Sequence, residues 1–158
     1  MKTQILTRCA LFAALHCVCA WLSIPLGDIA VTLQTFSMVL CLLILGGKWG
    51  CVSIFAYLVL GAVGLPVFSG FRGGIGHLLG VTGGYLWGFL LGGLVFWIFG
   101  GKHKILASIL SVITCYISGS LWFWLMFTPG GVASLSMVLL KCVVPFLIPD
   151  AMKIALAL

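Results

Sequence analysis

Five apolar segments, separated by short breaks that carry glycine or proline, run along the first 127 residues of the chain. The segments cover residues 5–24, 32–45, 49–63, 84–99 and 105–127. A helix needs roughly 20 apolar residues to cross a hydrocarbon core of about 30 Å, so runs of this kind predict membrane helices. Pro25, Pro66 and Pro129 follow three of the segments and indicate where those helices end.

The last apolar stretch, residues 134–158, allows two interpretations. In the first, a short helix over 134–147 is followed by a new helix that begins at Pro149, since proline suits the first helical position. That helix would have only about ten residues, or about 15 Å of rise, and would be too short to span. In the second, the whole stretch forms one kinked span. We therefore predict an all-α integral membrane protein, a compact six-transmembrane-helix bundle forming a single domain over 1–158.

Composition supports a membrane protein and excludes a soluble domain. The chain is 63% hydrophobic and 6% charged, and its mean hydropathy is +1.34. The net charge of +6 does not indicate nucleic-acid binding, because the basic residues are scattered and form no stripe. A positive start before an apolar run is also typical of a cleaved signal peptide, but further membrane segments follow it here.

The basic residues predict the orientation. Five of them precede or open the first segment or lie in alternate connections: Lys2, Arg8, Lys48, Lys102 and Lys104. The connections on the other side carry Asp28 and Arg72. Because cytoplasmic loops carry an excess of Lys and Arg, we expect a cytoplasmic N-terminus.

A glycine-dense stretch, residues 64–89, contains the predicted outer loop between helices 3 and 4. Irregular backbone near a bilayer is tolerated only where protein buries it or where it lines a polar cavity, so the loop is predicted to belong to a binding site. Gly73 and Gly74 let the backbone approach a ligand closely. Arg72 can clamp a carboxylate, but it can equally be a solvated loop charge.

Asp150 and Lys153 are three residues apart and share a face if they lie on a helix. Ionisable groups at membrane depth are costly, which favours a functional role. The alternative is a structural ion pair, with Asp150 also stabilised by a helix N-terminus.

Cysteine and histidine spacing argues against an enzyme or a metalloprotein. The seven cysteines show no CxxC pattern, and Cys17 and Cys19 are the one close pair on which an intramembrane thiol oxidoreductase could be based. The three histidines are dispersed, so we assign no metal and no cofactor. No GxxxxGK[ST] motif indicates nucleotide binding.

Ala10 and Ala14 place two small residues four apart on the first helix. Small residues at this spacing let helices approach closely in lipid, either against another subunit or inside the same bundle.

Several motifs resemble, in order, those of BioY, the biotin-specific S component of energy-coupling factor (ECF) transporters. They are TLQTF (32–36), GLPVF (64–68) with the GG pair after it, TGGYLWGF (82–89) and IPDAMK (148–153). The resemblance covers nearly the whole chain. It implies a multi-pass subunit of the bacterial inner membrane that captures biotin at its outer side. It also implies a transmembrane T component and two ABC-type ATPases as partners, while an S component for another vitamin is the alternative.

The same resemblance implies roles for particular residues. Ala10 and Ala14 would dock the T component, and Asp150 and Lys153 would contact the biotin head group. The ureido ring offers N–H donors and a carbonyl acceptor, which an aspartate and a lysine complement. The full predicted biotin-binding set is Asp150, Lys153, Arg72, Gly73, Gly74, Tyr85, Phe68, Trp87, Thr32 and Gln34.

In this set the aromatic residues would form an apolar wall for the thioether ring and the aliphatic tail. The ligand carboxylate would meet Arg72 or loop amides. Lys153 is a further candidate for that carboxylate.

Overall fold

The computed structural model describes residues 2–26, 29–101, 103–127 and 143–157. In these ranges it has six helices and a two-stranded sheet. The elements are α1 (Lys2–Trp21), β1 (Ser23–Leu26), β2 (Ile29–Thr32), α2 (Gln34–Ala62), α3 (Ile75–Leu78), α4 (Gly83–Phe99), α5 (Lys104–Phe127) and α7 (Val144–Ala157). The predicted helical membrane fold is therefore confirmed in outline, and α4 and α5 begin within one residue of the predicted segments.

The short hairpin of β1 and β2 was not predicted from the sequence and is added to the helical fold. The strands pair antiparallel, with Ser23 opposite Thr32 and Leu26 opposite Ile29. The first helix consequently ends at Trp21 and not at Ile24, because the chain becomes extended before Pro25. Hydropathy does not distinguish an apolar strand of four residues from the end of an apolar helix.

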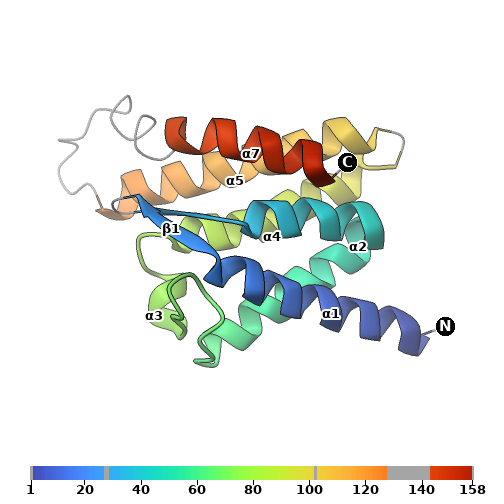
Figure 1. The fold of residues 1–158 in the computed structure, drawn as a ribbon, viewed down its shortest axis with the longest axis horizontal. Coiled ribbons are helices and arrows are strands. Elements are labelled where there is room, and N and C mark those ends of the chain that lie inside the picture. Colours follow the sequence, from blue (N-terminus) through green and yellow to red (C-terminus); the bar gives the residue numbers. More distant parts are fainter. Residues whose placement is uncertain (1, 27–28, 102, 128–142, 158) are drawn as a thin grey trace.

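The segments predicted at 32–45 and 49–63 join into α2 across a kink. Gly46 has φ 76° and ψ 167°, a conformation that the helix on either side does not adopt and that glycine tolerates. Figure 1 shows the two parts of α2 running in different directions. By length and composition α1, α2 and α5 can each cross a membrane, whereas α4 is an apolar helix of 17 residues.

The last helix differs from the first interpretation of its sequence. It begins at Val144, so the predicted start at Pro149 is wrong and the proline lies inside the helix. Proline removes its own amide donor and crowds the preceding turn, a cost that packing of α7 against α2 can offset. The helix has 14 residues, or about 21 Å of rise. The predicted short helix over 134–147 falls mostly outside the described residues.

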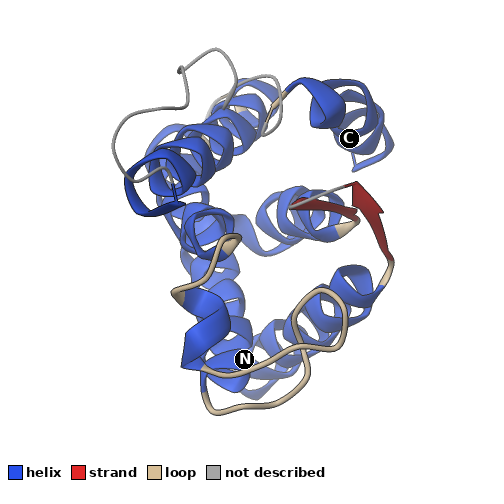
Figure 2. Ribbon diagram, turned by 90° about the vertical axis from the view of Figure 1, so that its left-hand side faces the viewer, coloured by secondary structure: helices blue, strands red, loops and turns tan. Residues whose placement is uncertain are grey.

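The bundle is organised around α2, which packs against α1, α4 and α7, while α4 lies along α5 (Figure 2). Gly84, Gly88 and Gly92 on α4 allow this close approach. A Cβ at Gly88 would lie 2.9 Å from Cys115 Cα, and one at Gly92 would lie 2.7 Å from the Ser111 carbonyl oxygen.

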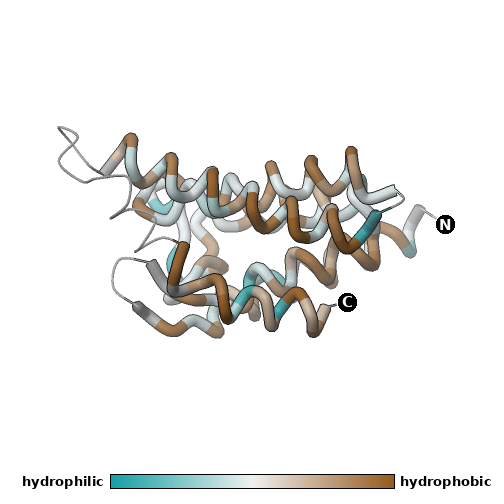
Figure 3. The backbone as a smooth tube through the Cα atoms, turned by 90° about the horizontal axis from the view of Figure 1, so that it is seen from above, coloured by the Kyte–Doolittle hydropathy of each residue, from teal (hydrophilic) through white to brown (hydrophobic). Residues whose placement is uncertain are grey.

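Large apolar side chains cover the outside of the bundle. Exposed examples on successive helices include Leu11, Phe55, Ile98, Ile117 and Leu156. Figure 3 shows hydrophobic positions along every helix, with hydrophilic ones few and localised. A surface of this composition suits lipid and would promote aggregation in water.

The two ends of the bundle differ. The start of α1 and the end of α7 lie at one end of the bundle, and the hairpin and α3 lie at the other (Figure 1). The glycine-rich loop that carries α3 connects α2 to α4 and belongs to the same end as the hairpin.

We expect Gly92→Val to destabilise the protein by about 1–3 kcal/mol, because the added side chain overpacks the interface between α4 and α5. Thermal unfolding in detergent measures the effect. Gly101→Ala is the matched control, since nothing lies within 4 Å of the added methyl group. Equal melting temperatures for the two variants would contradict the assigned packing.

Candidate functional site

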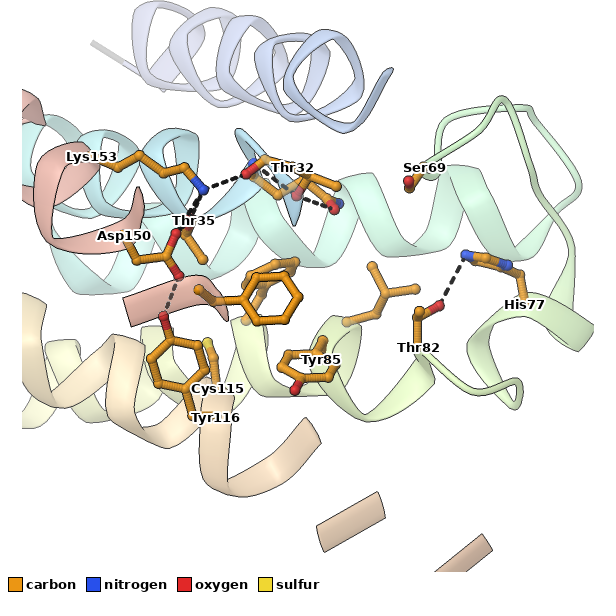
Figure 4. A pocket seen from close by; sticks show the side chains of 14 residues that line it. Thr32, Thr35, Ser69, His77, Thr82, Tyr85, Cys115, Tyr116, Asp150 and Lys153 are labelled. Carbon is orange, nitrogen blue, oxygen red and sulfur yellow. Dashed lines mark hydrogen bonds and ion pairs between the residues drawn. The ribbon is translucent and has the colours of Figure 1, made fainter. Parts of the chain in front are cut away.

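The candidate site is a cavity at the hairpin end of the bundle, lined by residues of β2, α2, α4, α5, α7 and the glycine-rich loop (Figure 4). One side of it is polar, with Thr32, Thr35, Tyr116, Asp150 and Lys153. Much of the remaining lining is apolar or aromatic, with Tyr85, Leu86, Phe89 and Phe146. This combination of an apolar wall and a few convergent polar groups is typical of small-molecule sites.

Asp150 and Lys153 form an ion pair inside the protein. Lys153 Nζ lies 2.7 Å from Asp150 Oδ1, and the two residues are only 7% and 3% exposed, respectively. Their spacing of three on α7 directs both side chains to one face, as the sequence predicted. Each charge would be costly to bury alone, so the close contact stabilises both.

Three further groups hold the ion pair in place. Lys153 Nζ donates to the Thr32 carbonyl oxygen at 2.6 Å. The Thr35 hydroxyl donates to Asp150 Oδ1 at 2.8 Å, and the Tyr116 hydroxyl donates to Asp150 Oδ2. The ion pair on α7 is thereby tied to the end of β2, the first turn of α2 and the middle of α5.

The first residue of α2, Gln34, adds a further polar side chain to the cavity. The Gln34 side chain donates to the Tyr57 hydroxyl at 2.7 Å, and its backbone N–H donates to Thr32 Oγ1 at 3.2 Å. Gln34 and Thr32 both line the cavity, so the structure brings these two predicted residues to the site.

The predicted aromatic wall is only partly present. Tyr85 lines the cavity. Phe68 is fully buried behind it, with ring centroids 5.5 Å from Tyr57 and 5.2 Å from His77. Trp87 is 38% exposed and does not line this cavity, because its position on α4 directs it outward.

The glycine-rich loop is tightly folded but keeps Arg72 outside the cavity. Phe68 and Arg72 form an isolated antiparallel bridge, with the Phe68 N–H donating to the Arg72 carbonyl oxygen at 2.9 Å. The Arg72 side chain is exposed, and neither Gly73 nor Gly74 lines the cavity. These three residues stay predicted ligand contacts.

His77, Thr35 and Tyr116 are among the lining residues that were not identified from the sequence. His77, on α3, stacks on Phe68, and its Nε2 lies 3.3 Å from Thr82 Oγ1. Thr35 lies within the TLQTF motif, which could have indicated it. Tyr116 has no local signal, because its role depends on a contact between α5 and α7.

Ala10 and Ala14 are both exposed on α1, whereas Ala13 is buried against the core. The predicted docking pair therefore faces away from the bundle. This placement is against the alternative that the pair serves internal packing.

Within the described part of the chain, no group of three or more His, Cys, Asp or Glu residues could hold a metal ion. The six described cysteines, including Cys17 and Cys19, are free and buried. Cys142 lies outside the described residues.

Comparison with known proteins identifies the family to which the chain belongs. The BioY family model matches residues 1–158. The chain belongs to the BioY family. A probable biotin transporter BioY from Pyrococcus horikoshii is 40% identical over 157 residues, which is 99% of this chain and 93% of the relative. The biotin transporter BioY of Thermotoga maritima is 46% identical over 99 residues, 63% of this chain and 59% of the relative.

A solved structure supports the same conclusion. The S-component for biotin from an ECF-type ABC transporter, whose crystal structure was determined at 2.1 Å, superposes with a TM-score of 0.86. It is 26% identical, and the match covers 99% of this chain and 87% of that one. BioY proteins are transporter subunits, so the prediction that this chain is not an enzyme is confirmed. A multi-pass membrane protein is likewise confirmed.

The electrostatics of the loop in this BioY protein generate a prediction. Burial, together with the nearby Arg72 guanidinium, lowers the pKa of His77 below its usual value near 6.5. We expect Arg72→Gln to raise the pKa of His77, because it removes a positive charge that opposes protonation. An NMR titration of the His77 ring measures the change, and Arg8→Gln, in α1, is the control.

The sign of the pH effect follows from the same shift. The folded loop binds fewer protons than the unfolded chain between the lowered pKa and the usual value, so its stability decreases as the pH falls through about 6.5. An unchanged His77 titration in Arg72→Gln would show that the guanidinium does not act on this ring.

Proposed function

We propose that this BioY protein is the membrane-embedded, high-affinity biotin-binding S component of an ECF-type vitamin transporter. The observation that carries the proposal is the buried Asp150–Lys153 pair inside a mainly apolar cavity, in a chain whose relatives are named as biotin transporters. A polar head with donors and an acceptor, attached to an apolar body, complements such a cavity.

The proposed pose follows from the two sides of the cavity. The ureido ring meets the polar side, where Asp150 accepts from a ring N–H and Lys153 or a neighbouring donor meets the carbonyl. The thioether ring and aliphatic tail lie along Tyr85, Leu86 and Phe89. The carboxylate points to the mouth of the site, where the exposed Arg72 and the amides of Gly73 and Gly74 are available.

We propose that the whole chain, residues 1–158, forms one domain in the bacterial inner membrane, with six crossings when the two parts of α2 are counted separately. The N-terminus is cytoplasmic, and the hairpin and glycine-rich loop face outward. The exposure of Arg8, Lys48 and Lys104 supports this orientation, given the preference of basic residues for the cytoplasmic side. Biotin then enters from outside.

Import requires partners that supply energy. The S component pairs with a transmembrane T component and two ABC-type ATPases, which drive release of biotin inward. The exposed Ala10 and Ala14 on α1 are the proposed contact with the T component, because small side chains admit a second helix at close range.

Asp150→Asn tests the polar end of the site. Removing one partner of a buried, hydrogen-bonded charge pair costs about 2–5 kcal/mol, so biotin affinity should fall at least tenfold. Isothermal titration of the purified protein with biotin measures the loss. Lys153→Met should give a loss of similar size.

Lys104→Met is the matched control for the lysine variant, because Lys104 is exposed at the start of α5 and does not line the cavity. Wild-type affinity in both site variants, with each protein folded, would refute the proposed site. Wild-type protein that binds another vitamin and not biotin would refute the proposed ligand.

The docking surface is tested by Ala10→Trp and Ala14→Trp. An indole on this face should hold a partner helix away without touching the cavity, so biotin binding survives while co-purification with the T component and cellular uptake fail. Ile117→Trp, on the exposed face of α5, is the control and should leave assembly intact. Lost binding with intact assembly would place the docking surface elsewhere.

A further inference from the structure

We propose that Tyr116 is a positioning residue, which orients the Asp150 carboxylate so that it keeps one acceptor site for a donor of the bound ligand. This inference rests on the proposed function and concerns the same site. Tyr116 reaches Asp150 from α5, whereas the other groups of the network lie on β2, α2 and α7. Figure 4 shows the Tyr116 hydroxyl directed at the carboxylate from the side opposite Lys153 and Thr35.

The acceptor sites of Asp150 can be counted. A carboxylate has about two acceptor sites on each oxygen. Among the described residues, Oδ1 accepts from both Thr35 and Lys153, so its sites are filled. Within the same described residues, Oδ2 accepts a hydrogen bond only from Tyr116, which leaves room for one further donor. The ligand N–H therefore belongs on Oδ2, and the Tyr116 hydroxyl decides in which direction the remaining site points.

The Lys153 ammonium has few hydrogen-bond donors left for a ligand. Its ammonium has three N–H groups, and it contacts Asp150 Oδ1 at 2.7 Å, the Thr32 carbonyl at 2.6 Å and Thr35 Oγ1 at 3.3 Å. A ligand acceptor could replace only the longest of these contacts without breaking a strong one. The main effect of Lys153 is then to compensate the negative charge of Asp150 and to hold Oδ1 in place. The ligand donor therefore binds Oδ2.

Tyr116 lies at the boundary between the cavity and the outside of the bundle. Tyr116 and Asp150 line the cavity and, on their other side, a groove between α5 and α7. The rest of this groove is apolar: Ile109, Val112, Ile113, Leu147, Ala151 and Ile154. The bond between Tyr116 and Asp150 thus crosses the gap between the two helices, and the two side chains together form the wall between the cavity and the groove. Tyr116→Phe preserves that wall and removes only the hydroxyl.

A double-mutant cycle tests the proposal. Biotin affinity is measured by titration for wild type, Tyr116→Phe, Asp150→Asn and the double variant. A hydrogen bond to a charged group is strong, so Tyr116→Phe should weaken binding about tenfold or more. If Tyr116 acts through Asp150, the same change should weaken binding by less than about threefold in the Asp150→Asn background. A residue that merely supports the fold would give the same loss in both backgrounds.

Thr114→Val is the matched control, since it removes a hydroxyl from the same helix that bonds the Leu110 carbonyl and does not line the cavity. Should Tyr116→Phe not fold, Tyr116→His, which keeps a ring N–H donor, is compared with Tyr116→Leu. Only the histidine variant should retain measurable affinity.

The outcomes separate this proposal from the proposed function. Additive losses in the cycle, or wild-type affinity in Tyr116→Phe, would overturn the positioning role while biotin binding by the wild type stands. Absence of biotin binding by the wild type would overturn both. Equal affinities of the histidine and leucine variants would also count against positioning by a donor.

Discussion

The rest of the site depends on one constraint, the burial of two opposite charges in a protein that is otherwise apolar. Only two acidic residues occur in the chain, and one of them, Asp150, lies inside beside Lys153. Removing such charges from water costs several kcal/mol per ion, and a single contact offsets this only when the remaining donors and acceptors are also paired. The Thr32 carbonyl and the hydroxyls of Thr35 and Tyr116 provide that pairing.

The backbone around the cavity is arranged so that it brings hydrogen-bond partners to the two buried charges. A strand end supplies a carbonyl oxygen that carries no intrahelical hydrogen bond, whereas a carbonyl inside a helix already accepts from the amide four residues on. The hairpin brings the Thr32 carbonyl to Lys153, and α2 begins two residues later, so that Thr35 in its first turn meets Asp150. At the other end of the bundle the break at Gly46 lets the chain change direction within α2, and the small residues along α4 allow α5 to pack closely against it.

The structure of the glycine-rich loop depends less on buried charge than on its backbone conformation. Gly64, Gly70 and Gly74 have positive φ, and so does Phe71 at 58°, which is unusual for a residue with a side chain. Trp21 of α1 holds this loop from outside, since its indole N–H donates to the Pro66 carbonyl at 2.8 Å and its ring stacks on Phe71. The loop is therefore anchored to the first helix.

The sequence by itself determined the membrane class, most helix positions and the pairing of Asp150 with Lys153, because hydropathy and residue spacing along one helix are local properties. Tertiary structure decided the hairpin, the start of α7 before Pro149 and the separation of Arg72 and Trp87 from the cavity. It also brought Tyr116 and His77 to the site. Which residue of a helix faces a cavity depends on the neighbouring helices, and the packing of α2, α4, α5 and α7 fixes that facing only after the chain has folded.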